Sequence, residues 1–476
     1  MKRFRIFLLC SCFLAIAGGG WAVSIRVLAT GDMHGALQSQ PTGGQQLGGA
    51  AEMLAYWKHN EAEELKGCLV LGCGDANSGS PLANLFKGDP VVTVMDLMGY
   101  DACALGAHDF DFGREQLDAW GKLADFPFLA ANLKKADGNT FELAVPYTIV
   151  EKQGVKIGIV GLMTKNLLKL TDRAAGLKVI PYTDALISAV PAARKAGAQV
   201  VIVVAHVPQT ELLDLAREVP ELQIPLMLGG ESHDVAINKV GRTWVVSSGQ
   251  NWQSYARVTL EVTGERAIVQ NAQVVWLQQT QPEADKGVAG AIAAWQQKMQ
   301  AMMATPVGTA SAVLPKGSDG LYNFVDDCML EGDAKAQIAF TNYGSLRTDL
   351  PAGQVTVGDI YKVLPFNDSI YRVTISGAQL VGYFHEIGGK VGMAGLRMQD
   401  GQYQLTKTGQ PLDPDATYQV LVNNFMYEQS PLLQAADALP TSAFADWRQP
   451  LLEWFAKHPS STEKPFTADT QPRMGQ

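Results

Sequence analysis

The first half of this chain repeats one pattern: a short apolar run, a turn of glycine and polar residues, and a stretch with helical spacing. The residues between 89 and 98 show the helical part, because Val91, Val94, Met95 and Met98 would share one apolar face, with Asp89 as the predicted cap. Such alternation predicts a layered α/β domain. The predicted strands are residues 25–29, 69–72, 102–105, 128–131, 155–162, 200–205 and 226–229.

The chain has 476 residues, too many for one ordinary hydrophobic core, so we expect more than one domain. Strand-like runs without intervening helices, at 244–247 and 256–262, predict antiparallel strands at the end of the first domain, residues 24–278. A polar, proline-containing connection and a helix over 285–303 then form a linker, residues 279–305. Residues 306–458 predict a less regular α+β domain, and residues 459–476 a loosely held tail.

The amino terminus has the form of a secretory signal peptide. Lys2, Arg3 and Arg5 precede an apolar run over residues 6–17, and small residues lead to a predicted cleavage after Ala22. Removal would change the net charge from −9 to −12, which disfavours nucleic acid and anionic membranes as partners. The signal peptide predicts a periplasmic or secreted protein. Four cysteines would remain after cleavage, too few for a disulfide framework, so we expect them to be buried free thiols.

Histidines and carboxylates follow the predicted strands. Loops at the carboxyl ends of strands converge in open α/β sheets, so these side chains predict a metal site that holds two ions. Gly74-Asp75 offers a carboxylate able to bridge them, and Asp111 is close enough in sequence to orient the His108 imidazole. The segments are Asp32-Met33-His34, Gly74-Asp75, His108 to Asp111, His206 and Glu231-Ser232-His233.

These segments resemble the calcineurin-like metallophosphoesterases, and more narrowly the secreted bacterial 5′-nucleotidase and 2′,3′-cyclic phosphodiesterase family. The resemblance rests on Gly31 to Gly35, Gly74 to Leu82, Met98 to Ala102, Gly106 to Gly113 and Gly229 to His233. In the second half, Asn342 to Arg347 is similar to that family's Asn-Gly-Gly-Gly-Ile-Arg loop, and Val363 to Asn367 to its Leu-Pro-Phe signature.

The resemblance implies a metallophosphoesterase sandwich, a 5′-nucleotidase carboxyl-terminal domain, and hydrolysis of nucleotides or related phosphate esters by a metal-activated water. It implies one metal (manganese, zinc or iron) on Asp32, His34, Asp75 and His233, and a second on Asp75, His206 and further ligands. It also implies that His108, paired with Asp111, stabilises charge on the phosphoryl group. In the second domain it implies substrate contacts from Asn342 and Arg347, with a base held between Phe366 and Phe425.

The chain departs from the family at the second metal. Ala107 stands where the family has a ligating asparagine, and Glu231 where it has a histidine, although a glutamate still ligates through oxygen. The family's Gly-Gly-Asp segment is absent after Phe425. Two alternatives therefore stay open: a thiosulfohydrolase of the sulfur-oxidation type that shares the metal domain, or a non-catalytic descendant that binds nucleotide or metal.

Overall fold

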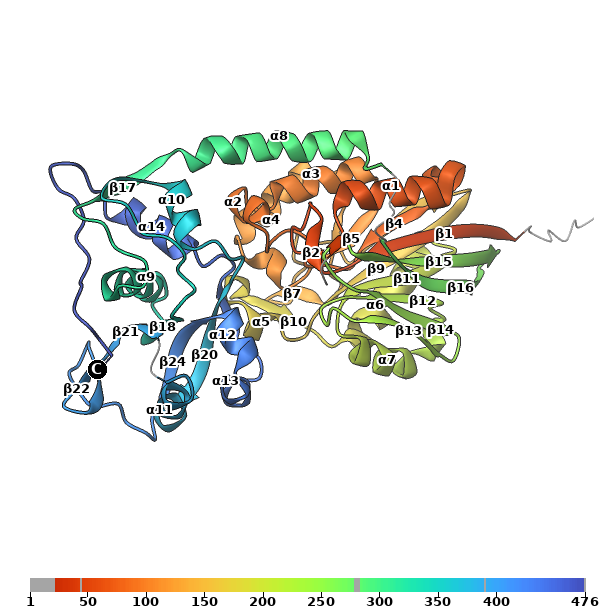
Figure 1. The fold of residues 1–476 in the computed structure, drawn as a ribbon. Helices are drawn as coiled ribbons and strands as arrows, with labels where there is room; N and C mark the ends of the chain where they lie inside the picture. The colour runs from red at the N-terminus through yellow and green to blue at the C-terminus, as the bar shows by residue number, and fades with distance from the viewer. Residues whose placement is uncertain (1–21, 43–44, 278–282, 389–390, 475–476) are drawn as a thin grey trace, which may run out of the picture.

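The computed structural model describes residues 22–42, 45–277, 283–388 and 391–474. The predicted signal peptide, apart from Ala22, and most of the predicted connection at 278–283 lie outside these residues. Figure 1 shows two lobes joined along one side by the long helix α8 (Lys286–Met303). Within the described part of the chain, no helix combines the length and apolar character needed to cross a bilayer.

The amino-terminal lobe contains two six-stranded sheets, each mixing parallel and antiparallel pairs. The first has the order β16-β15-β1-β4-β5-β6 and the second β13-β14-β12-β11-β9-β8. In the first, the strands are β1 (Val23–Thr30), β4 (Leu69–Gly72), β5 (Ala102–Ala104), β6 (Phe128–Leu129), β15 (Ser254–Thr263) and β16 (Arg266–Trp276). In the second, they are β8 (Tyr147–Lys152), β9 (Val155–Met163), β11 (Val200–His206), β12 (Leu226–Gly229), β13 (Val235–Val240) and β14 (Thr243–Ser248).

The alternation of side chains along β1 shows why this lobe is layered. Val27 and Ala29 belong to the apolar core between the two sheets, whereas Leu28 belongs to the core that covers the outer face of the first sheet. Successive residues of a strand point to opposite faces, so one strand of continuous apolar sequence serves both cores. The predicted layered α/β class is confirmed, and all seven predicted strands are present.

Helices α1 (Ala50–Glu61), α3 (Asp89–Met98) and α4 (Arg114–Leu123) pack on the first sheet, and α6 (Tyr182–Lys195) and α7 (Gln209–Glu218) on the second. The apolar face predicted for α3 is buried. The predicted cap is wrong: Gly88, with φ of 82°, occupies the N-cap position without a side-chain bond, and Asp89 lies in the first turn. A glycine accepts this left-handed conformation without the steric penalty of a side chain.

The carboxyl-terminal lobe is built on a five-stranded sheet of order β21-β18-β24-β20-β25. Helices α9 (Asp319–Gly332) and α14 (Gln449–Lys457) contribute to the core on one side, and α11 (Gly377–Glu386) to the core on the other. The sheet strands are β18 (Ile338–Asn342), β20 (Ile370–Ser376), β21 (Val391–Ala394), β24 (Thr417–Asn423) and β25 (Thr441–Phe444). Between and beside them lie β17 (Pro306–Ala310), β19 (Gly353–Thr356), β22 (Leu396–Gln399), β23 (Gln402–Leu405), α10 (Val357–Val363), α12 (Asn424–Gln429) and α13 (Pro431–Ala436).

Three expectations need correction. Residues beyond Pro459 are not loosely held over the described part, because Phe466 packs on Phe324 and Arg473 forms ion pairs with Asp327. Residues 244–247 lie in β14, which pairs antiparallel with β13, as predicted, but also parallel with β12, which was not expected. The spacing of Val288, Ile292 and Met302 in the helix over 285–303 predicts one apolar stripe; on α8 Val288 and Ile292 are buried, but Met302 is exposed.

Candidate metal centre

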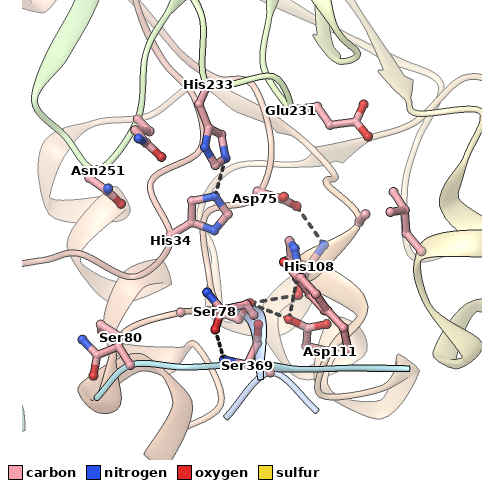
Figure 2. A pocket seen from close by; sticks show the side chains of 18 of the residues that line it. His34, Asp75, Ser78, Ser80, His108, Asp111, Glu231, His233, Asn251 and Ser369 are labelled. Carbon is pink, nitrogen blue, oxygen red and sulfur yellow. Dashed lines mark hydrogen bonds and ion pairs between the residues drawn. The ribbon is translucent and has the colours of Figure 1, made fainter. Parts of the chain in front are cut away.

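The predicted ligands lie together at the carboxyl ends of four strands. Asp32 and His34 follow β1, Asp75 follows β4, His206 ends β11 and His233 follows β12. Figure 2 shows His34 and His233 side by side, with their Nε2 atoms 3.0 Å apart. The Nε2 atom of His206 lies 3.1 Å from Oδ2 of Asp75. Residues separated by up to 201 positions in the chain thus meet in one place because parallel strands deliver their loops to one edge.

Two groups of ligand-type atoms have the spacing of a metal site. Asp32, His34 and His233 form the first, and Asp32, Asp75 and His206 the second, with all ligand atoms in a group within 4.8 Å of one another. The carboxylate common to both groups is Asp32, whereas the sequence predicts Asp75 as the bridge. Each group mixes imidazole nitrogen and carboxylate oxygen, a donor set suited to manganese, zinc or iron.

The backbone at these ligands is in the left-handed region, which side chains other than glycine seldom adopt. The φ angles are 50° at Asp32, 45° at His34, 50° at Asp75 and 56° at His233. Backbone hydrogen bonds hold the loops in place: Asp32 N donates to Gly74 O at 3.1 Å and His34 N to Asp75 O at 2.9 Å. Such conformations persist only where surrounding structure fixes them, and they cluster at functional sites.

Burial and mutual charge shift the pKa values of these groups in opposite directions. Burial raises the pKa of Asp32 to about 7 against the opposing effect of His206, and burial lowers the pKa of His34 to about 3. At His206 burial opposes protonation, but the Asp75 carboxylate outweighs it and raises the pKa to about 10. Positive charge stabilises buried carboxylates such as these. That charge can come from protonated histidines or from a bound metal ion.

Two buried atoms test whether the residues fit a metal. Nε2 of His206, on a side chain with no exposed surface, lies 3.1 Å from Asp75 Oδ2 and has no hydrogen-bond partner among the described residues. Oε2 of Glu231 is also buried without a hydrogen-bond partner. Buried polar atoms in native structures nearly always have a partner, so these two atoms fit the role of ligands to a divalent cation. Nδ1 of His206 lies 3.1 Å from Cys73 O, which leaves Nε2 as the coordinating nitrogen.

The second site is the one with altered donors. Ala107 is buried beside the cavity and offers no ligand atom. The backbone N–H of Glu231 donates to both carboxylate oxygens of Asp32, at 2.9 and 3.1 Å, so this residue holds Asp32 in place through its main chain. The Glu231 side chain lies outside the two compact ligand groups, although it lines the same cavity. Its assignment as a ligand stays a prediction.

His108 and Asp111 form a pair at the edge of the cavity, as the sequence predicts. Nδ1 of His108 lies 3.0 Å from Oδ2 of Asp111, and the hydroxyl of Ser78 donates to the same oxygen at 2.7 Å (Figure 2). Burial opposes protonation of His108, but the carboxylates of Asp111 and Asp75 prevail and raise its pKa to about 10. These carboxylates therefore favour the protonated imidazole, whose side chain is partly exposed beside the metal ligands.

Sequence reasoning gave no role to Asp109, yet this side chain organises two of the loops. Its Oδ1 accepts hydrogen bonds from Ala76 N, Asn77 N and Asn77 Nδ2, and its Oδ2 accepts one from Gly106 N. The residue is fully buried, and burial together with Asp75 raises its pKa to about 6. The available signal was an acidic residue beside the aromatic Phe110 in the loop after a predicted strand, where burial would demand hydrogen-bond partners.

The four predicted substrate residues of the second lobe do not line the cavity at the metal ligands. Two of them are in contact, since the Arg347 guanidinium lies 5.2 Å from the centre of the Phe366 ring, while Asn342 Oδ1 accepts a hydrogen bond from Asn423. Phe366 and Phe425 are 40% and 51% exposed. The cavity at the metal ligands has a volume of about 530 Å³. The second lobe lines it with residues to which the sequence gave no role: Asn367, Ser369, Tyr371, Asn424 and Glu428.

Known proteins are similar to this chain over one lobe or over both. Residues 301–435 match the family model of the 5′-nucleotidase C-terminal domain. The protein UshA of Yersinia enterocolitica is 23% identical over 92% of this chain and 93% of its own length. The endonuclease YhcR of Bacillus subtilis is 26% identical over 85% of this chain, which spans only 37% of that relative. The NAD nucleotidase structure of Haemophilus influenzae has a TM-score of 0.74 and 18% identity, covering 96% of this chain and all of the other.

Fold and site together define a protein with a layered α/β amino-terminal lobe and a carboxyl-terminal lobe that carries the family match. Over most of its length the chain is similar to 5′-nucleotidase relatives, and residues 301–435 match the 5′-nucleotidase C-terminal domain, which supports the resemblance seen in its sequence motifs.

Proposed function

We propose that this protein hydrolyses phosphate monoesters, nucleotides or related compounds, with divalent metal held by Asp32, His34, Asp75, His206 and His233. The observation that carries the proposal is the convergence of these side chains, in left-handed backbone conformations, beside the His108–Asp111 pair. A divalent cation there supplies Lewis acidity, which lowers the pKa of water and neutralises charge on phosphoryl oxygens. The relatives named nucleotidase support the same class of substrate.

The chain's own side chains would act as follows. His108, kept cationic by Asp111 and Asp75, would donate a hydrogen bond to a phosphoryl oxygen and stabilise the charge that develops there. Asp111 would orient the imidazole, and the Ser78 hydroxyl would hold Asp111. Asn367 and Asn424, on the opposite wall, would bind the rest of the substrate.

Nucleotide specificity is a finer proposal. Phe366 and Phe425 are exposed and outside the cavity at the metal ligands, so a base held between them would need the second lobe to move before its phosphate reached His108. The ion pairs of Asp172 with Arg372 and Lys335 join the lobes in the present arrangement and would break in that movement.

Whether a second metal ion binds distinguishes an enzyme from a non-catalytic binding protein. Ala107 removes one donor, which favours a non-catalytic descendant; the orphaned Oε2 of Glu231 favours a second ion of altered affinity. We propose the latter, with export to the periplasm or outside the cell on the strength of the amino-terminal sequence.

The experiment is a phosphate-release assay on nucleoside monophosphates, cyclic nucleotides and an aryl phosphate, after loading with Mn²⁺ or Zn²⁺. His108→Ala should lose at least roughly a hundredfold in kcat while metal content, measured by mass spectrometry, stays unchanged. His458→Ala is the matched control, because this histidine pairs with Glu331 in the other lobe. Absence of turnover with every ion would leave the binding protein as the correct description.

A further inference from the structure

A second cavity, of about 220 Å³, adjoins the one at the metal ligands. The two share Ala107, His108 and Asp111 as part of their walls. A group placed in the smaller cavity is therefore in direct contact with the residues that we assign to the phosphoryl group. Ala107 forms part of this boundary, where the longer asparagine side chain of the family would extend into the shared space.

Aromatic and aliphatic side chains make up most of the wall. The rings of Tyr371 and Tyr427 meet edge to face, with centres 5.5 Å apart and an angle of 86°. The Tyr427 hydroxyl donates to Asp437 O at 2.8 Å, which fixes the ring. Leu170, Leu439 and Pro440 complete the apolar surface. A planar apolar ligand would find edge and face contacts here without rearrangement of the side chains.

One polar atom in this wall has no partner. The hydroxyl oxygen of Ser442 is buried and makes no hydrogen bond with the described residues. Buried hydroxyls nearly always have a hydrogen-bond partner, so this one beside a cavity suits a ligand or water with a hydrogen-bonding atom.

Both lobes contribute residues to the wall of the smaller cavity. Leu170 and Thr171 come from the first lobe, and Tyr371, Tyr427 and Ser442 from the second. Thr171 and Ser442 form an isolated parallel β-bridge, and the Thr441 hydroxyl donates to Lys169 O at 2.9 Å. The cavity is thus a defined feature of this arrangement of the lobes, in contrast to the exposed group around Phe366 and Phe425.

We propose that this cavity is a leaving-group subsite for an aromatic ring bonded directly to the phosphate, which makes aryl phosphate monoesters a substrate class of this site. The ring would lie between Tyr371, Tyr427 and Leu439, with a polar substituent at Ser442, while the phosphoryl group contacts His108. A nucleotide has a ribose between phosphate and base, so its base would not reach a cavity that begins at His108 itself.

The reaction balances with water alone. Water oxygen bonds to phosphorus, the bond from phosphorus to the aryl oxygen breaks, and the two protons of water end on the phenol and on inorganic phosphate. This subsite rests on the proposed function, since it requires the phosphoryl group at His108.

Binding of non-hydrolysable analogues tests the subsite without reference to turnover. Calorimetry with Mn²⁺-loaded protein should show phenylphosphonate binding roughly ten- to a hundredfold more tightly than methylphosphonate, because only the former buries a ring. Ala438→Phe would fill the cavity from an exposed position and should abolish the preference while leaving methylphosphonate affinity unchanged. Ala435→Phe, exposed on α13 and outside the cavity, is the matched control and should keep the preference.

Equal affinity for the two phosphonates would overturn the subsite and leave the proposed function standing. A preference that survives Ala438→Phe in a variant of unchanged circular dichroism would overturn it as well. Failure of both phosphonates and of inorganic phosphate to bind would overturn the proposed function, and the subsite with it.

Discussion

Asp109 gives the sharpest test of how the loops at the metal ligands are held. Asp109→Asn keeps the size of the side chain but puts an NH₂ group opposite a backbone N–H. If the remaining oxygen keeps the three donors at Oδ1, the bond from Gly106 N to Oδ2 is lost. Loss of a hydrogen bond to a charged acceptor costs about 1.5–3 kcal/mol, and the opposed donors add to it, so we expect about 3 kcal/mol.

Hydrogen exchange measures this effect locally. At 1.4 kcal/mol per factor of ten, the amides of Gly106, Ala76 and Asn77 should exchange roughly a hundredfold faster in Asp109→Asn. The affinity for Mn²⁺ should fall in parallel, because the same loops carry Asp75 and His108, and His108 N donates to Asp75 Oδ1 at 2.8 Å. Asp118→Asn, a carboxylate 48% exposed on α4, is the control and should change stability by less than about 0.5 kcal/mol. Exchange rates within twofold of the parent protein would refute the assigned role.

Three further predictions concern the second metal, pH and the joint between the lobes. Ala107→Asn restores an amide donor beside Asp75 and should raise the affinity for the second Mn²⁺, read as two ions per chain in calorimetry; unchanged stoichiometry and affinity would contradict it. Burial raises the pKa of Asp326 to about 8, so the folded state keeps a proton that the unfolded chain loses near pH 4. The free energy of unfolding should therefore fall as pH rises from about 4 to 8. Asp326→Asn should remove that fall in urea denaturation and be more stable at pH 8 by a few kcal/mol; an identical pH profile would count against it. Asp172→Asn weakens a partly exposed ion pair with Arg372, so small-angle scattering should show a broader range of lobe arrangements while stability drops by about 1 kcal/mol or less; an unaltered scattering profile would exclude this role.

The layered lobe was predictable from sequence because its strands are buried on both faces. Such strands read as continuous apolar runs with sharp ends, and β4, β11 and β12 have the limits expected to within one residue. The same sharp ends led to the prediction of Asp32, Asp75, His206 and His233, because the loops that follow buried parallel strands are where ligand sites form.

Features that depend on contacts between distant segments were not predictable. The tail beyond Pro459 is polar in composition, yet it packs through contacts with distant residues: Phe466 on Phe324, 142 positions away, and Arg473 with Asp327. The same holds for the cavity wall of Asn367, Ser369 and Asn424, because the angle between the lobes determines which residues face the metal ligands. No local pattern encodes that angle.

Metal content tests the central claim most directly. Purified protein, stripped with chelator, incubated with Mn²⁺ and freed of excess ions, should retain at least one ion per chain by mass spectrometry. Asp32→Asn, which alters the carboxylate shared by both ligand groups, should retain substantially less. Retention of no ion by the parent protein, or equal retention by Asp32→Asn, would contradict the assignment of these loops as a metal centre.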